Sequence, residues 1–120
     1  MRALLTFVAL AVCGLANAAT CNVTEFKERP PVTYQAAFLP ALASSNVTYT
    51  TSSVQSAVFD VNTALVRITC DALAYVLVGS NPTALLTSLR ITAGQTEYFT
   101  VLPASTPPLY ASVRLAVIGP

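Results

Sequence analysis

The chain of 120 residues contains no histidine and no tryptophan, and only 9% of its residues are charged. An average soluble domain has about 25% charged residues. Beyond residue 47, the acidic residues are Asp60, Asp71 and Glu97 alone. Nucleophilic catalysis usually needs histidine as a base, and carboxylate catalysis needs two neighbouring acids. The composition therefore argues against an enzyme and favours a structural or binding protein.

Metal ligands and basic residues are scarce as well. With no histidine and no Cys-x-x-Cys spacing, the sequence offers no zinc site, and we expect no cofactor. The formal net charge is +1, and it falls to 0 if a leader containing Arg2 is removed, because five basic and five acidic residues remain. A neutral chain has no electrostatic footprint for nucleic acid or for anionic lipid. It also has little repulsion between copies, which suits the homo-oligomer that we expect. The alternative explanation of the low charge is a small domain with a neutral surface rich in serine and threonine.

Apolar residues, in contrast, make up 54% of the chain, and many of them lie at its N-terminus. Residues 1–18 have a positive start, an apolar run and an Ala-Asn-Ala cleavage site, which is typical of a signal peptide cleaved after Ala18. The apolar run is too short for a transmembrane helix. Alternatively, translation starts at a valine-type codon at Val23, as happens in bacteria and phages, and the apparent leader is an artefact of gene prediction.

The expected state of the cysteines depends on this choice. If the leader is removed after Ala18, Cys21 and Cys70 remain as a possible disulfide in an oxidising compartment. If the protein starts at Val23, Cys70 is a lone thiol, and burial in an apolar core is then its expected role.

Residues 19–45 are predicted to form an extended N-terminal arm, and residues 46–120 a separate domain. Pro30, Pro31 and Pro40 argue against a long helix in the arm. Two alternatives stay open for this segment. It either leaves the domain to lie on a neighbouring molecule, or it contributes a strand to its own sheet.

From residue 47 onward the chain shows short segments of period-two alternation, which is typical of half-buried strands. The segment 73–78 is apolar on both faces, as in a central strand, whereas 83–89 is expected to be a loop or a short helical turn. The predicted strands are residues 47–51, 54–59, 64–69, 73–78, 96–102 and 109–118. This pattern predicts an all-β protein, namely an antiparallel β-sandwich with a jelly-roll-like arrangement.

A few polar and aromatic residues have candidate roles in this fold. Asp60 and Asp71 lie at predicted strand ends, where aspartate commonly caps turns. Tyr98 and Phe99 are adjacent on a strand, so one of them points outward and is a possible contact to a partner. Two Asn-x-Thr triplets, at 22–24 and 46–48, would be glycosylation sites only in a eukaryotic secretory pathway, and we attribute them to chance in a threonine-rich chain.

Five segments resemble motifs of a group of small proteins from tailed bacteriophages. In that group a Ser-Ala-x-Phe strand precedes Val-Arg-Ile, then a Gly-Thr-Asn-Pro-Thr-Ala turn, an Ala-Gly-x-x-Glu-Tyr segment and a final Val-Ala-Val-Ile strand. Here the corresponding segments read Val-Gln-Ser-Ala-Val-Phe at 54–59, Val-Arg-Ile at 66–68, Val-Gly-Ser-Asn-Pro-Thr-Ala at 78–84, Ala-Gly-Gln-Thr-Glu-Tyr-Phe at 93–99 and Leu-Ala-Val-Ile at 115–118. The resemblance covers residues 46–118 and depends on the order and spacing of the motifs.

The resemblance implies a virion-associated structural protein, such as a capsid decoration or cement protein, that binds the major capsid protein or another virion protein. It implies neither a nucleic-acid partner nor a membrane partner for the mature form. A virion protein assembled in the host cytoplasm has no use for a secretory leader, which gives weight to the start at Val23. If the leader is genuine, the alternative is a secreted or periplasmic β-sandwich binding module.

Overall fold

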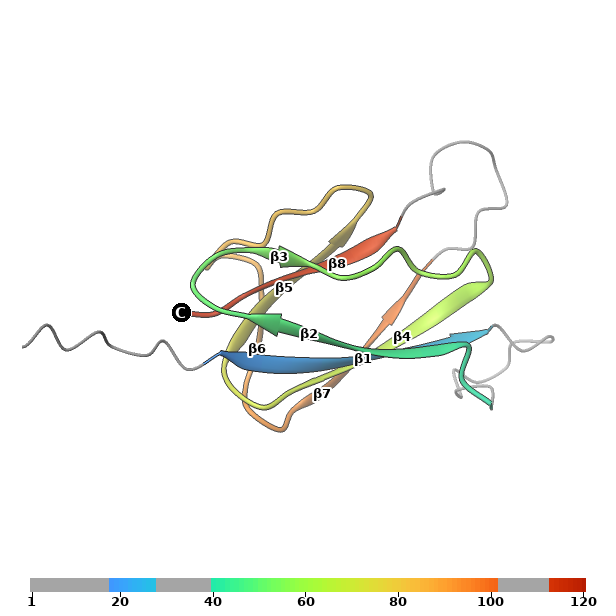
Figure 1. Cartoon of the computed structure of the whole chain (residues 1–120), viewed down its shortest axis with the longest axis horizontal. Helices are drawn as coiled ribbons and strands as arrows, with labels where there is room; N and C mark the ends of the chain where they lie inside the picture. The colour runs from blue at the N-terminus through green and yellow to red at the C-terminus, as the bar shows by residue number, and fades with distance from the viewer. Residues whose placement is uncertain (1–17, 28–39, 102–112) are drawn as a thin grey trace, which may run out of the picture.

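The computed structural model describes residues 18–27, 40–101 and 113–120. These residues form an all-β fold of two four-stranded antiparallel sheets, which confirms the predicted antiparallel β-sandwich (Figure 1). No helix in the described segments is long and apolar enough to cross a membrane. The eight strands are β1 (Ala19–Lys27), β2 (Ala43–Tyr49), β3 (Val54–Gln55), β4 (Thr63–Cys70), β5 (Ala74–Gly79), β6 (Leu89–Ile91), β7 (Thr96–Thr100) and β8 (Arg114–Ile118).

Strand β1 lies in the middle of sheet A, whose order is β2-β1-β4-β7. It pairs with β2 on one side and with β4 on the other, both antiparallel. The prediction of an arm separate from the domain is therefore wrong for β1 and for the start of β2, and the domain begins at residue 19 rather than at 46. Residues 28–39 lie outside the described part of the chain. Of the two alternatives left open, the observed one is a strand in the protein's own sheet.

The physical reason is a period-two pattern in β1 that the polar residues of this segment disguise. The side chains of Cys21 and Val23 point into the sandwich and are almost fully buried, whereas Asn22 points outward. The third inward position is Glu25, a carboxylate where an apolar residue would be expected. Because of this buried charge, the strand does not show a simple apolar-polar alternation in the sequence.

Sheet B has the order β3-β8-β5-β6 and packs on sheet A. Between the sheets lies one apolar core to which nearly every strand contributes. Its almost fully buried apolar side chains are Cys21, Val23, Tyr49, Val66, Ile68, Cys70, Ala74, Val76, Ile91, Leu115 and Val117. The predicted strands at 64–69 and 73–78 supply its centre, as β4 and β5.

Five of the seven connections pass from one sheet to the other, since only β1–β2 and β5–β6 join neighbours within a sheet. Crossing connections are typical of Greek-key sandwiches, and the jelly-roll-like arrangement itself stays a prediction. Two details differ from expectation. The strand expected at 54–59 pairs only over Val54–Gln55, and β6 was not predicted. A strand of three residues, such as β6, is too short to show an apolar-polar alternation in the sequence.

The Glu25 side chain joins the segment between β3 and β4 to the middle of sheet A through hydrogen bonds. Its Oε2 accepts hydrogen bonds from the Asp60 N–H (2.7 Å) and from the Thr63 hydroxyl (2.6 Å). Both Glu25 and Thr63 are buried. A buried carboxylate is tolerated only where it is hydrogen-bonded, so these two donors explain why an acid occupies a core position.

We therefore predict that Glu25→Ala lowers the free energy of unfolding by about 3 kcal/mol, because it leaves two donors unsatisfied. Glu25→Gln keeps an oxygen acceptor and should cost about 1 kcal/mol. Urea unfolding followed by circular dichroism measures both. Glu97→Ala, on the edge strand β7, is the control and should change stability by less than about 0.5 kcal/mol. Equal losses for Glu25→Ala and Glu97→Ala would contradict the role given to Glu25.

Candidate functional site

The acids beyond residue 47 hold parts of the fold together. Asp60 Oδ1 accepts from the Asn62 N–H and Asp71 Oδ1 from the Thr20 N–H, each at 2.8 Å, so both aspartates stabilise strand ends as expected. Glu97 accepts from a neighbouring glutamine side chain. The described residues contain no group of three or more histidine, cysteine, aspartate or glutamate side chains able to hold a metal ion.

Tyr98 and Phe99 lie on opposite faces of β7, as their adjacency requires. Phe99 pairs with Val66 and packs against the core, whereas Tyr98 points outward and is 56% exposed. Tyr98 is thus the member of the pair that is available to a partner. Its strand, β7, is the marginal strand of sheet A among the described residues, so the Tyr98 side chain lies at the margin of the sheet.

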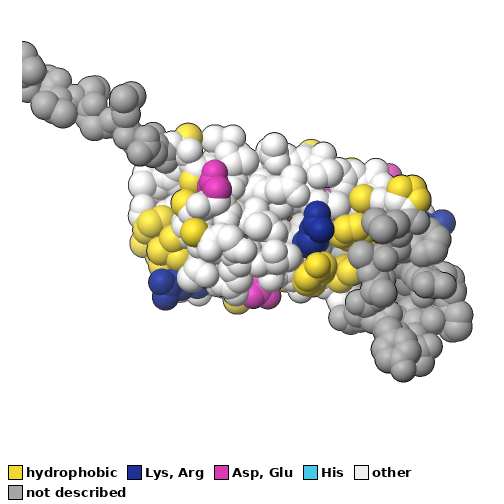
Figure 2. Space-filling view, turned by 90° about the horizontal axis from the view of Figure 1, so that it is seen from below, with side chains coloured by type: hydrophobic (Ala, Val, Ile, Leu, Met, Phe, Trp, Pro, Cys, Tyr) yellow, Lys and Arg dark blue, Asp and Glu magenta, His cyan; other side chains and the backbone are white. Residues whose placement is uncertain are grey.

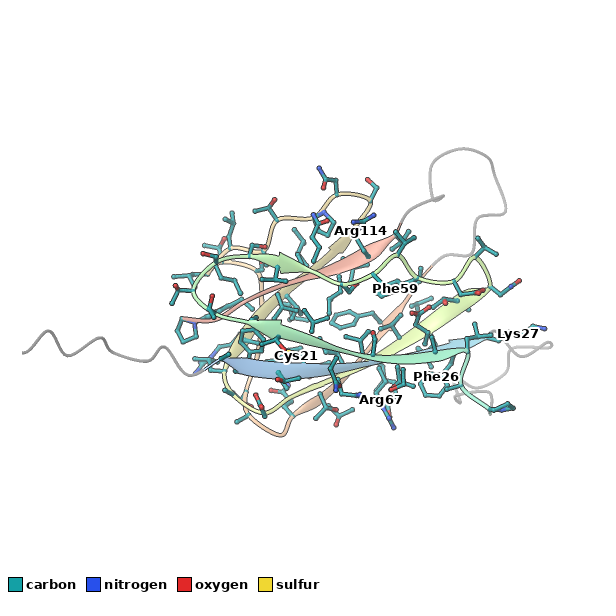
Figure 3. All side chains as sticks on the ribbon, in the orientation of Figure 1. Cys21, Phe26, Lys27, Phe59, Arg67 and Arg114 are labelled. Atoms are coloured by element: carbon teal, nitrogen blue, oxygen red, sulfur yellow. A yellow bond between two sulfur atoms is a disulfide. The ribbon has the colours of Figure 1, made fainter. Side chains whose placement is uncertain are left out.

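Tyr98 belongs to an outer-face cluster that we define as Phe26, Leu65, Arg67 and Tyr98. The register places Arg67 directly opposite Tyr98, and Leu65 opposite Phe26. The Arg67 guanidinium lies 5.8 Å from the centroid of the Phe26 ring, a cation–π distance. Arg67 also donates to the Thr24 hydroxyl at 3.3 Å. Figure 3 shows Phe26 and Arg67 on the side of sheet A that is turned away from the core.

Phe26 is only 3% exposed although its strand position points outward, and the Arg67 guanidinium lies over its ring. Among the described residues no acidic side chain pairs with Arg67, which contacts the Phe26 ring and the Thr24 hydroxyl. Tyrosine and arginine are enriched among the residues that dominate the binding energy of protein interfaces. The cluster is therefore the strongest candidate contact site on sheet A.

The rest of the outer face of sheet A is mainly polar. Figure 2 shows this surface as mostly white, with a few acidic side chains and with hydrophobic side chains gathered mainly toward its two ends, near basic residues. A side-chain hydrogen bond joins β1 to β2, since Asn22 Nδ2 donates to Asn46 Oδ1 at 3.1 Å, and within β1 the Thr24 hydroxyl donates to Asn22 Oδ1 at 3.0 Å. The two asparagines of the Asn-x-Thr triplets are thus direct cross-strand neighbours whose side chains are hydrogen-bonded to each other.

Cys21 and Cys70 form a disulfide between β1 and β4. The Asp71 N–H donates to the Thr20 carbonyl, which makes Cys21 and Cys70 a non-hydrogen-bonded antiparallel pair. Side chains are closest at such pairs, and here the Cα atoms are 4.0 Å apart. Both cysteines point into the core and are almost fully buried. The disulfide joins residues 49 positions apart and ties the first strand to the centre of the fold.

One end of the sandwich contains an open cavity of about 380 Å³ between the start of β1 and the C-terminus. Ala19, Tyr49, Leu73 and Pro120 contribute to its largely apolar lining. Figure 1 shows the beginning of β1 and the C-terminus at this same end. The cavity offers no convergent set of charged groups, so it specifies no ligand.

Tyr49 is the one ionisable residue that lines this cavity. It is 2% exposed, and its hydroxyl donates to the Ala72 carbonyl at 2.9 Å. Burial, and next the negative charge of Asp71, raise the pKa of Tyr49 above its ordinary value of 10.0. The phenol therefore stays neutral in the folded protein and acts as a structural donor.

The outer-face cluster was only partly predictable from the sequence. Alternation along 64–69 already placed Arg67 on the polar face, and the adjacency of Tyr98 and Phe99 required one outward aromatic. The contribution of Phe26 was missed, because it depends on β1 lying beside β4 in the same sheet. The signal that could have revealed it is the alternation of Cys21 and Val23 against Asn22.

Comparison of the chain with known protein families, with curated proteins and with solved structures finds no match.

Replacing both Cys21 and Cys70 by alanine should destabilise the fold, because the disulfide restricts the unfolded chain. For a closed loop of this length, chain-entropy arguments give a loss of about 4 kcal/mol. Urea unfolding of the double variant measures it. Reduction of the unsubstituted protein should give a comparable loss, and stability unchanged by both treatments would show that the bond contributes nothing.

Tyr49→Phe tests the neutral phenol. The pKa of the Tyr49 phenol is raised in the folded protein. The contribution of this phenol to the free energy of unfolding is therefore complete below the pKa of an unfolded tyrosine, about 10, and is lost as the pH rises through the folded pKa. The unsubstituted protein should therefore lose stability above about pH 10, and Tyr49→Phe should lose less over the same range. At pH 7 the variant should lose about 1 kcal/mol through the missing hydrogen bond. Unfolding curves between pH 7 and 11 decide this, with Tyr98→Phe as the exposed control, which should behave like the unsubstituted protein.

Proposed function

We propose that this chain is a non-enzymatic structural protein of a tailed-bacteriophage virion, a head-associated component of the decoration or cement type. In this proposal the protein acts by associating with itself and by binding the major capsid protein or another virion protein. The observation that carries the proposal is the exposed Tyr98 beside Arg67, which has no acidic partner among the described residues, on the outer face of sheet A.

The positions of the phage-like motifs in the fold are consistent with this proposal. The segment 54–59 begins with β3, and its Ser-Ala-x-Phe motif follows that strand and ends at Phe59, a core residue, whereas Val-Arg-Ile lies in β4 with Arg67 at its centre. The Glu-Tyr motif includes Tyr98 on β7, and the last motif forms most of β8. Thus two motifs contain residues of the outer-face cluster, whereas the others supply the core that positions it.

The chemistry of this surface suits binding to a protein. A partner that covers Tyr98 and places a carboxylate beside Arg67 would bury an aromatic anchor and pair an arginine, which is the usual composition of an interface hot spot. The surrounding hydroxyl and amide groups could form the polar rim. The described residues offer no basic stripe for nucleic acid, since Arg67 is the only basic side chain in the cluster.

A second function, a secreted or periplasmic binding module, is favoured by one observation. Strand β1 begins at Ala19, directly after the expected cleavage site, and includes a cysteine of the disulfide. A chain starting at Val23 would lack four residues of β1 and could not form this bond. Disulfides also persist on virion surfaces, so the bond itself is compatible with both functions.

The proposal is tested by mass spectrometry of purified phage particles whose genome encodes this chain. We expect the protein at many copies per particle. Its absence from particles, together with a mature N-terminus at Ala19 in the periplasm or medium, would instead establish the second function. The N-terminal peptide distinguishes Ala19 from Val23 in either case.

Substitutions in the outer-face cluster should weaken attachment to the particle. Tyr98→Ala and Arg67→Ala are each expected to lower the affinity for particles that lack the protein by about 30-fold, the effect of losing one hot-spot residue. Co-sedimentation of purified protein with such particles measures the affinity. Arg90→Ala, on β6 of sheet B, is the matched control and should bind normally. Normal binding by both cluster variants would exclude this surface as the contact.

A further inference from the structure

Sheet A has a long edge that no other strand of the described residues pairs with. Its marginal strand β2 has seven residues, Ala43–Tyr49, and pairs only with β1. In the ladder, Cys21 and Val47 form a hydrogen-bonded pair, because Cys21 directs its backbone away from β4. The backbone groups of Ser44, Asn46 and Thr48 consequently point away from the sheet. No backbone partner for these three residues occurs within the described part of the chain.

The β2 edge also lacks the features that normally protect such edges. Proline, charged side chains, bulges and very short strands keep sheet edges from pairing with other chains. The sequence of β2, Ala-Ser-Ser-Asn-Val-Thr-Tyr, contains neither a proline nor a charge, and its first four residues are exposed. The edges of sheet B are protected, since β3 has two residues and β6 has three, including Arg90.

We propose that the β2 edge is the site at which a second copy of this chain binds, with the two β2 strands antiparallel around a two-fold axis at Asn46. The inference deepens the proposed function, on which it rests for the expectation that copies associate. A row of unpaired N–H and C=O groups is complementary to an extended strand. Wherever the protein assembles, other copies of the chain are present, and each presents the same β2 edge.

The two-fold register satisfies both the backbone and the side chains. Asn46 faces Asn46 of the second molecule, and Ser44 and Thr48 face Thr48 and Ser44 of the second molecule. These three hydrogen-bonded pairs supply about six backbone hydrogen bonds. The facing side chains are small, uncharged and able to form hydrogen bonds, as cross-strand serine and threonine pairs do. Because β2 carries no charge, no like charges meet anywhere along the paired strands. The result is a continuous eight-stranded sheet made of two copies of sheet A.

The opposite margin of sheet A, formed by β7, fits a second copy less well. Strand β7 has five residues and includes Glu97, and its Tyr98 belongs to the outer-face cluster. Pairing through β7 would place this charge in the interface and would occupy part of the surface proposed for the virion contact. The β2 edge leaves that surface free for the shell.

The test is the association of the purified full-length chain, measured by sedimentation equilibrium over a range of concentrations. We expect a monomer–dimer equilibrium. Thr48→Pro removes an outward N–H that has no partner in the monomer, so the fold should tolerate it, as edge strands tolerate proline. It should weaken dimerisation about 30-fold, through one lost hydrogen bond in each half of the interface. Thr96→Pro, which removes the corresponding outward N–H at the start of β7, is the matched control and should dimerise normally.

Asn46→Lys is a second variant that does not depend on backbone geometry. It places two like charges opposite each other at the two-fold axis and should abolish the dimer at low salt, with partial recovery at high salt. A monomer at all concentrations, or a dimer weakened by Thr96→Pro but not by Thr48→Pro and Asn46→Lys, would overturn the inference. These outcomes are separate from the virion test, because a protein that dimerises through β2 but is absent from particles would retain this interface and lose the proposed function.

Discussion

The rest of the fold depends on the position of β1 between β2 and β4. This strand supplies the disulfide through Cys21, an apolar core residue through Val23 and the buried carboxylate of Glu25, which holds the turn before β4. Each of these three inward positions acts on a different part of the sandwich. Removal of β1 would expose the edge of β4, a strand with almost fully buried inward residues, so sheet A cannot be complete without residues 19–27.

This dependence bears on where the functional chain begins. A start at Val23 would keep Glu25 and Phe26 but would shorten β1 by nearly half, and it would leave Cys70 unpaired in the core. It would also remove Thr20, whose N–H donates a hydrogen bond to Asp71 Oδ1. The structure therefore makes residues 19–22 part of the folded domain. A virion protein with this fold needs a start upstream of Val23 or a leader cleaved before Ala19, and either is compatible with a sandwich that begins at residue 19.

The sequence was sufficient for the fold class because the alternation in β4 and the apolar run in β5 are long enough to register as strands. It was insufficient at β1, where Glu25 interrupts the pattern, and at β6, which has only three residues. Among the candidate contact residues, the outward direction of either Tyr98 or Phe99 followed from adjacency alone. Which of the two faces out depends on the register with Val66, and the packing of Phe26 against Arg67 depends on sheet order. Both are properties of tertiary pairing.

The marginal strands of sheet A, β2 and β7, determine which arrangements of copies strand pairing can produce. Pairing of a β2 edge with the β7 edge of the next molecule would leave a free edge at each end, and such head-to-tail contacts continue until a ring closes or a filament forms. Pairing of β2 with β2 is isologous and closes after two copies. Because Glu97 and the bulky Tyr98 lie on β7 whereas β2 carries small uncharged side chains, the two edges are chemically unlike, and self-pairing of β2 is favoured over mixed pairing. In the proposed function, an assembly that ends at two copies would leave two outer-face clusters on one continuous sheet, so that a single dimer would engage two neighbouring sites on a symmetric shell. Two linked contacts of moderate affinity give a much higher overall affinity than either contact alone.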